Sequence, residues 1–234
     1  MPRLSAQLLA LALAACSATQ SGGPGQDGGP ANGAGIAAKY PGDVGIENEP
    51  DVIFADGFEN GSFSAWSSAT TNGGDLSVTA LAALVGSNGM QAVINDTTNI
   101  YITDDTPSAE SHYRARFYFN PNSIVMADST AQYIFVGSDT GSVFQVDFRI
   151  SAGSYQIRLR QYNDAGSVQS ISWVTISDAP HSVELDWWAS TAAGANNGGI
   201  TLWVDGVQSG GLTGVDNDTR RIESVRLGAV SGID

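Results

Sequence analysis

Five arginines lie in stretches where apolar and polar residues alternate, and their positions predict a shared chemical role. They are Arg114, Arg116, Arg149, Arg158 and Arg160. In each stretch the arginine has the parity opposite to the apolar residues, so all five point away from a core if the stretches are strands. A guanidinium binds a carboxylate or a sulfate through two parallel hydrogen bonds. The pattern indicates an anion-binding face; the alternative is a solvated face held by cross-strand ion pairs worth under about 1 kcal/mol each.

A second group of candidate side chains lies within residues 181–208, where two strands joined by a loop of small residues are expected. Glu184, Asp186 and Trp188 share the polar face of the first strand, and Trp203 lies on the polar face of the second. An indole stacks on a sugar ring, and carboxylates accept hydrogen bonds from sugar hydroxyls. These residues predict a carbohydrate-binding platform; the alternative is that a loop covers the tryptophans and makes them a secondary core.

Strand-like runs bounded by turn residues recur from residue 51 to residue 234, and none has a sustained helical period. They are Val52–Ala55, Leu76–Ala80, Met90–Ile94, Ile100–Thr103, His112–Phe119, Gln132–Gly137, Val143–Ile150, Tyr155–Tyr162, Ser170–Ile176, Ser182–Ala189, Ile200–Asp205 and Ser224–Ala229. So many short strands indicate two sheets packed face to face, or a barrel. We predict an all-β sandwich of two antiparallel sheets.

The residues Ser-Ala-Gly-Ser at positions 151–154 suit a tight turn between two of these strands. A simple hairpin about this turn places Asp147 opposite Arg158 and Gln145 opposite Arg160. The remaining tryptophans are expected in the core: Trp66, Trp173 and Trp187.

Composition limits the classes of function. The chain has 234 residues, of which 42% are hydrophobic and 15% charged, which is too apolar for a disordered protein. Its formal net charge of -14 repels phosphate backbones, so nucleic acid is not an expected partner. Cys16 is the single cysteine, so no intramolecular disulfide can form and the core must be held by packing.

The N-terminus has the pattern of an export signal. Residues 1–15 contain a basic residue, Arg3, then an apolar run that is too short to span a bilayer of about 30 Å. Leu13-Ala14-Ala15-Cys16 resembles the lipobox of bacterial lipoproteins, in which the cysteine is acylated; the alternative is an ordinary cleavable signal. We expect lipidation at Cys16, a flexible glycine-rich tether over residues 16–50 and a folded domain over residues 51–234.

The folded region also carries motifs that resemble those of a known superfamily. Asp56-Gly57-Phe58-Glu59, followed by Gly61 and Trp66, is similar to the opening of bacterial secreted jelly-roll modules of the concanavalin A-like lectin/glucanase and laminin-G-like type. The stretches Val183–Trp187 and Leu202–Gly206 resemble the paired strands near the end of such modules. These modules usually close with one more strand beside the first, and no such strand is recognisable before Asp234. The resemblance implies a jelly-roll sandwich, with its last strand missing or its first strand exposed.

The resemblance also implies where a ligand binds. In such proteins one sheet face forms a saccharide groove, where guanidiniums would hold a uronate carboxylate or a sulfate. A polysaccharide lyase would need a base near such a group, and His112, Tyr118, Arg114 and Arg116 are the candidate catalytic set for that alternative. The related glucanases use two glutamates on one strand. In this sequence Glu184 corresponds to the first of them, and Ala189 stands where the second glutamate would be. The pair of carboxylates for glycoside hydrolysis is therefore incomplete.

No cofactor is certain. The resemblance allows a structural calcium ion near the first strand, with Asp56 and Glu59 as oxygen ligands. We expect a monomeric protein of the cell envelope, anchored in the bacterial outer membrane through lipid alone, whose domain binds carbohydrate without catalysis. The alternatives are a polysaccharide lyase or glycoside hydrolase acting on an acidic polysaccharide, and a structural or protein-binding surface module.

Overall fold

The computed structural model of the chain describes residues 6–16, 46 and 52–233. Its strands are β1 (Ala6–Cys16), β2 (Val52–Asp56), β3 (Ser68–Thr70), β4 (Leu76–Thr79), β5 (Gly89–Ile94), β6 (Ile100–Asp104), β7 (His112–Asn120), β8 (Ala131–Ser138), β9 (Ser142–Ser151), β10 (Ser154–Tyr162), β11 (Val168–Ser170), β12 (Val174–Ile176), β13 (His181–Trp188), β14 (Gly198–Val204), β15 (Val207–Val215) and β16 (Ser224–Ser231). Two short 3₁₀ turns, Asn72–Gly74 and Ala80–Ala82, connect early strands. Among the described residues no helix has the length and apolar character needed to cross a membrane.

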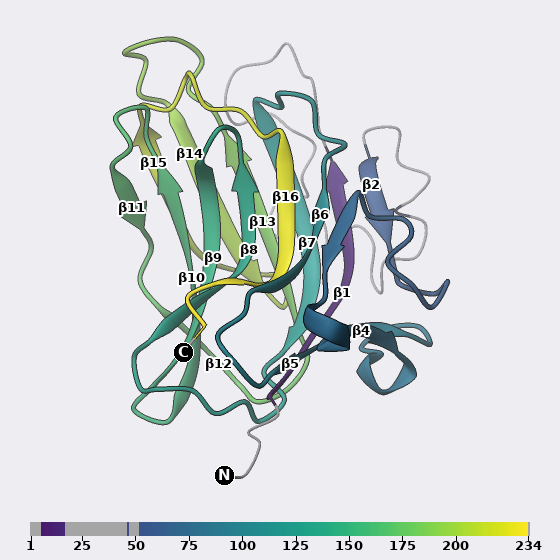
Figure 1. The fold of residues 1–234 in the computed structure, drawn as a ribbon. Helices are drawn as coiled ribbons and strands as arrows, with labels where there is room; N and C mark the ends of the chain where they lie inside the picture. The colour runs from purple at the N-terminus through teal and green to yellow at the C-terminus, as the bar shows by residue number, and fades with distance from the viewer. Residues whose placement is uncertain (1–5, 17–45, 47–51, 234) are drawn as a thin grey trace.

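The strands form two antiparallel eight-stranded sheets. Sheet A has the order β15-β14-β13-β7-β1-β5-β4, with β2 also paired to β1. Sheet B has the order β11-β10-β9-β8-β16-β6-β3, with β12 also paired to β10. Figure 1 shows the sheets as two layers, with the C-terminal strand β16 (yellow) between β8 and β6. The predicted all-β, two-sheet sandwich is confirmed.

The core lies between the sheets and is rich in aromatic side chains. Phe117 of sheet A and Phe135 of sheet B have ring centroids 5.2 Å apart, and Phe119 and Phe148 are 5.0 Å apart. Trp187 is fully buried among them, as expected from the sequence. Because each strand alternates inward and outward side chains, this core leaves one outer face on each sheet, and every candidate site residue must lie on one of the two.

Two hairpins fix which side chains lie opposite each other. Ala152 and Gly153 both have positive φ, as a two-residue turn between β9 and β10 requires. The resulting register pairs Asp147 with Arg158 and Gln145 with Arg160, as predicted. In the other hairpin the apolar row of β13 lies opposite that of β14, with Leu185 facing Leu202.

Besides β1, the structure differs from the expected strand list in three places. The predicted strand Ser170–Ile176 is two strands, β11 and β12, because the backbone leaves the sheet at Trp173. The glycine-rich β15 was not expected, although the Asp205-Gly206 turn that precedes it has positive φ at both residues and is the hairpin type that continues into a strand. The short β3, Ser68–Thr70, was also not expected; all three of its residues are exposed, so no apolar alternation marks it.

The N-terminal segment lies inside sheet A. β1 pairs with β7 on one side and with β5 and β2 on the other (Figure 1, purple). The first strand of the predicted domain, β2, therefore has a neighbour where the sequence suggested an exposed edge. The same residues form most of the predicted export signal. The predicted tether falls outside the described residues apart from Cys16, the last residue of β1, and Ile46, which is buried. Signal function and lipidation at Cys16 stay predictions.

Asp104 is an acidic side chain that points into the sandwich from β6. It is fully buried; one carboxylate oxygen accepts hydrogen bonds from the Thr106 amide and hydroxyl, and the other has no partner. Burial raises the pKa of Asp104, and the nearby hydroxyl of Tyr113 is also buried without a partner. A buried carboxylate with a raised pKa stabilises the fold only when protonated, so its charge costs stability at neutral pH.

Asp104→Asn is therefore expected to raise the denaturant midpoint at neutral pH. The amide removes the buried charge and keeps an oxygen that can accept from Thr106. The gain should shrink as the pH falls from the raised folded-state pKa toward the ordinary aspartate value of about 3.9, and it should vanish below that value, because the wild-type carboxyl is then neutral in both states. Equilibrium unfolding at several pH values measures this, and a loss of stability at neutral pH would show that the ionised carboxylate is needed.

Candidate functional site

The outer face of sheet B holds a buried carboxylate beneath two arginines. Asp147 of β9 accepts a hydrogen bond from Arg158 Nε at 2.9 Å, and Arg160 Nη1 lies 3.4 Å from the same oxygen. Its other oxygen accepts from Gln145 Nε2 at 3.0 Å. The Asp147 side chain is 0% exposed, whereas those of Arg158 and Arg160 are 23% and 20% exposed. Burial raises the pKa of Asp147, and its arginine partners oppose that shift.

Trp173 lies on this same face, between two guanidinium groups. Arg149 and Arg158 have their guanidinium carbons 4.0 and 4.2 Å from its ring centroid, both within cation–π distance. Arg149 Nε also donates to Gln156 at 2.8 Å. The sequence-based placement of Trp173 in the core is wrong: the indole is half-buried and covers the outer face of β9 and β10.

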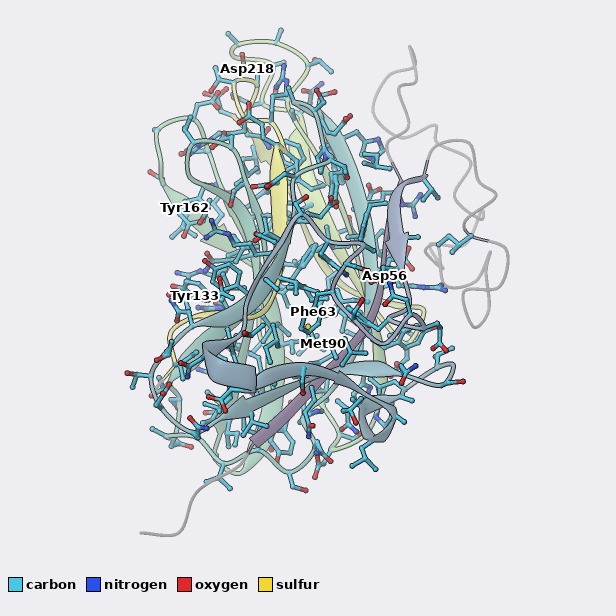
Figure 2. All side chains as sticks on the ribbon, turned by 45° about the vertical axis from the view of Figure 1, so that its right-hand side comes forward. Asp56, Phe63, Met90, Tyr133, Tyr162 and Asp218 are labelled. Carbon is cyan, nitrogen blue, oxygen red and sulfur yellow. The ribbon has the colours of Figure 1, made fainter. Side chains whose placement is uncertain are left out.

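Aromatic residues accompany the other arginines of the face. Arg160 lies 5.9 Å from the ring centroid of Tyr133, and Arg226 of β16 lies 4.9 Å from that of Tyr101. Tyr162 donates a hydrogen bond to Gln145 at 3.3 Å. Burial raises the pKa of Tyr162, so its hydroxyl stays protonated at neutral pH. Figure 2 shows Tyr133 and Tyr162 along one side of the molecule.

The outer face of sheet B has a charge opposite to that of the protein as a whole. Among the described residues of β6, β8, β9, β10 and β16, four arginines have outward parity and Asp147 is the one acidic side chain that does. The face thus has an excess of three positive charges in a chain of net charge -14. A cationic surface on an acidic protein concentrates anions locally.

The outer face of sheet A has compensated charges instead. Arg114 and Arg116 of β7 lie in register with Asp186 and Glu184 of β13. Arg114 Nη2 lies 3.4 Å from Glu184, and its Nε lies 4.0 Å from Asp186. His112 Nε2 lies 2.6 Å from Asp186. Two guanidiniums and two carboxylates, with His112 beside Asp186, meet across these two strands, as expected of a face held by its own ion pairs.

The five strand arginines and His112 therefore do not converge. All point outward as predicted, but Arg114 and Arg116 are on sheet A, with His112 and Tyr118, while Arg149, Arg158 and Arg160 are on sheet B. The alternation of residues along a strand tells which side chains point out of the core. It does not tell whether they lie on the outer face of sheet A or on that of sheet B. The candidate catalytic set for a lyase and the anion-binding set thus lie on opposite sides of the sandwich.

The two tryptophans of the predicted sugar platform are held by local contacts. Trp188 donates to the Asn197 carbonyl at 2.8 Å, and its ring lies so close to Gly199 that an added Cβ would be 2.4 Å from it. Trp203 is only 7% exposed, and Glu184 opposite it is buried. Glu184, Asp186, Trp188 and Trp203 share one face, with Trp203 opposite Glu184 and Trp188 four residues further along β13, and a buried indole offers little ring surface for stacking.

The second histidine is also a structural residue. His181 lies at the start of β13 and is only 8% exposed. Its Nδ1 lies 2.7 Å from Asp205, and its Nε2 lies within 3.2 Å of the Ser177 amide, hydroxyl and carbonyl. The ring joins the start of β13 to the turn after β14.

The carboxylates suggested for calcium have other partners. Asp56 accepts hydrogen bonds from the Phe58 amide and the Trp66 indole, and Glu59 accepts from the amides of Ser87 and Asn88. The backbone bonds lower the pKa of Glu59. Among the described residues, an acidic cluster with metal-ligand spacing lies elsewhere, at Asp164, Asp216 and Asp218. Figure 2 shows Asp218 at one end of the molecule, away from Asp56.

A comparison with a solved structure agrees with this architecture. No family model matches the chain, and no curated protein matches it. Its fold is similar to that of an endo-β-1,4-glucuronan lyase from the fungus Trichoderma reesei, with 14% sequence identity and a TM-score of 0.56, over 72% of this chain and 80% of the other. A polysaccharide lyase of family 18 is more distant, with 13% identity and a TM-score of 0.41, over 69% of this chain and 73% of the other. The chain thus has a β-sandwich fold that occurs in a polysaccharide lyase.

Proposed function

We propose that the protein binds an acidic polysaccharide on the outer face of sheet B. The observation that carries this proposal is the excess of cationic side chains there, with Arg149, Arg158 and Arg226 each stacked on an aromatic ring. Guanidiniums bind carboxylates, and Tyr133 and Tyr162 on the same face supply rings for contact with sugar rings. This face therefore offers contacts both for the carboxylates and for the sugar rings of an acidic polysaccharide.

The outer face of sheet A supports this function less well, although it carries two of the arginines and two tryptophans. Arg114 already has carboxylate partners in Glu184 and Asp186, so an incoming anion would have to displace or oppose them. Binding there would also cost the desolvation of charges that are paired in the free protein.

Calorimetric titration with polyuronates and with neutral glucans of similar length tests the proposal. We expect binding of the acidic chains alone, and weakening as salt is added, because the contacts are between charges. Equal affinity for acidic and neutral chains would contradict an arginine-based site.

A second candidate function is β-elimination on the same ligand. In this reaction a base removes the proton next to the uronate carboxyl group, and an acid protonates the departing glycosidic oxygen. Tyr162 is held protonated beside Gln145 and can supply that proton, and Tyr101 and Tyr133 are further phenols on the face. The similarity to a glucuronan lyase fold supports testing it. Unsaturated chain ends appearing in the ultraviolet spectrum would establish turnover, and their absence would leave binding alone.

The cellular location is part of the same proposal. The lipobox-like Leu13–Cys16 and the absence of aspartate after the cysteine support an exported protein anchored in the outer membrane by lipid. Metabolic labelling with a fatty acid, in the wild type and in Cys16→Ser, tests the anchor.

A further inference from the structure

A row of four side chains crosses sheet B from β16 to β10. Arg226 lies in register with Val136 of β8, Val136 with Gln145 of β9, and Gln145 with Arg160 of β10. Neighbouring strands are about 4.8 Å apart, so three strand spacings separate the Cα atoms of Arg226 and Arg160 by about 14 Å. The two arginines mark the ends of one row on one face.

The side chains between the two arginines carry no charge. Val136 and Gln145 are almost completely buried, and Tyr133 and Tyr162 are the aromatic neighbours on either side of Gln145. An extended ligand that crosses the strands along this row meets a cation, then an uncharged strip, then a second cation. The charges are separated across the sheet rather than clustered.

Arg226 differs from Arg160 in what holds it. Arg160 shares the buried Asp147 with Arg158, so part of its charge is already balanced. Arg226 is exposed, its guanidinium stacks on Tyr101, and no ion pair within the described residues involves it. Tyr101 belongs to β6, on the side away from β10, and thus draws the guanidinium outward along the row. The aromatic contact orders the side chain while leaving its hydrogen-bond donors available to a ligand.

We propose that Arg226, ordered on Tyr101, is a second anion subsite that binds a carboxylate of the polysaccharide chain; its Cα atom lies about 14 Å across the sheet from that of Arg160, which forms the first subsite with Arg158. This inference rests on the proposed function and extends it, because it requires a ligand long enough to reach both subsites at once. Once the ligand is bound at the first subsite, the second contact is intramolecular and adds affinity without a second association cost.

A series of acidic oligosaccharides of increasing length tests the subsite. Wild-type affinity should rise by about tenfold at the length that first spans the row, the value expected for one added charge-assisted contact. Arg226→Ala should remove this rise and leave the affinity for shorter oligomers nearly unchanged. Arg226→Lys should keep part of the rise, because the charge remains while the planar guanidinium is lost.

Arg221→Ala is the matched control, because it removes one positive charge from a residue that donates to backbone carbonyls before β16 and not to this face. It should bind like the wild type at every length. Three results would overturn the second subsite: equal weakening of short and long oligomers by Arg226→Ala, a length-dependent rise that survives the substitution, or no rise with length in the wild type. Failure of the wild type to bind any acidic oligomer would instead overturn the proposed function, and the subsite with it.

Discussion

Replacing Arg158 and Arg160 together with glutamine is expected to weaken binding of an acidic polysaccharide by at least about a hundredfold. Each guanidinium would lose a charge-assisted contact worth roughly 1.5–3 kcal/mol, and 1.4 kcal/mol corresponds to a factor of ten in affinity. Calorimetric titration of the same polyuronate into wild type and variant measures the change.

The two arginine substitutions must be combined with a substitution of Asp147, because this carboxylate is buried under both arginines. Removing its partners alone leaves an uncompensated buried charge, which costs several kcal/mol of stability. The variant should therefore also carry Asp147→Asn. The control is Arg114→Gln with Glu184→Gln, which neutralises an ion pair on the outer face of sheet A. If the control loses binding and the sheet B variant keeps it, the proposed face is wrong.

A chain that begins at Cys16 is expected to be less stable than the full-length chain by several kcal/mol. Without β1, the facing edges of β7 and β5 lose their backbone partners, and β2 loses its neighbour. Each backbone hydrogen bond contributes about 0.5–1.5 kcal/mol net, and exposed sheet edges also promote association.

Chemical unfolding of the two chains, with light scattering to detect association, measures this effect. The comparison also bears on the predicted export signal, because a processed lipoprotein lacks residues 1–15. Equal unfolding midpoints for the two monomeric chains would contradict a stabilising role for β1. Equal midpoints would also agree with a lipoprotein whose domain functions after residues 1–15 have been removed.

The sequence predicts the fold well because alternation is a local property. Parity in β9 and β10 places Phe144, Val146 and Phe148 inside, and the Ala152-Gly153 turn sets the register that pairs Asp147 with Arg158. β15 cannot be predicted in this way, because a strand with three glycines and few apolar residues shows no alternation of apolar and polar residues.

The site is harder to predict because it depends on which strands become neighbours. Nothing local indicates that β16 lies between β8 and β6, so Arg226 could not be grouped with Arg160. Trp173 looks like a core residue by type, and its position between Arg149 and Arg158 arises only because β11 and β12 both pair with β10. The separation of Arg114 from Arg149 onto opposite faces has the same origin.

The five tryptophans report which face binds the ligand, since each lies in a different environment. Trp173 lies on sheet B, Trp188 and Trp203 lie on sheet A, and the others are buried. Their indole N–H signals in a nitrogen-15 correlation spectrum can be followed while an acidic oligosaccharide is added. We expect the Trp173 signal to shift with saturation, and no shift with a neutral oligosaccharide. Shifts of Trp188 or Trp203 with an unmoved Trp173 would contradict binding on sheet B.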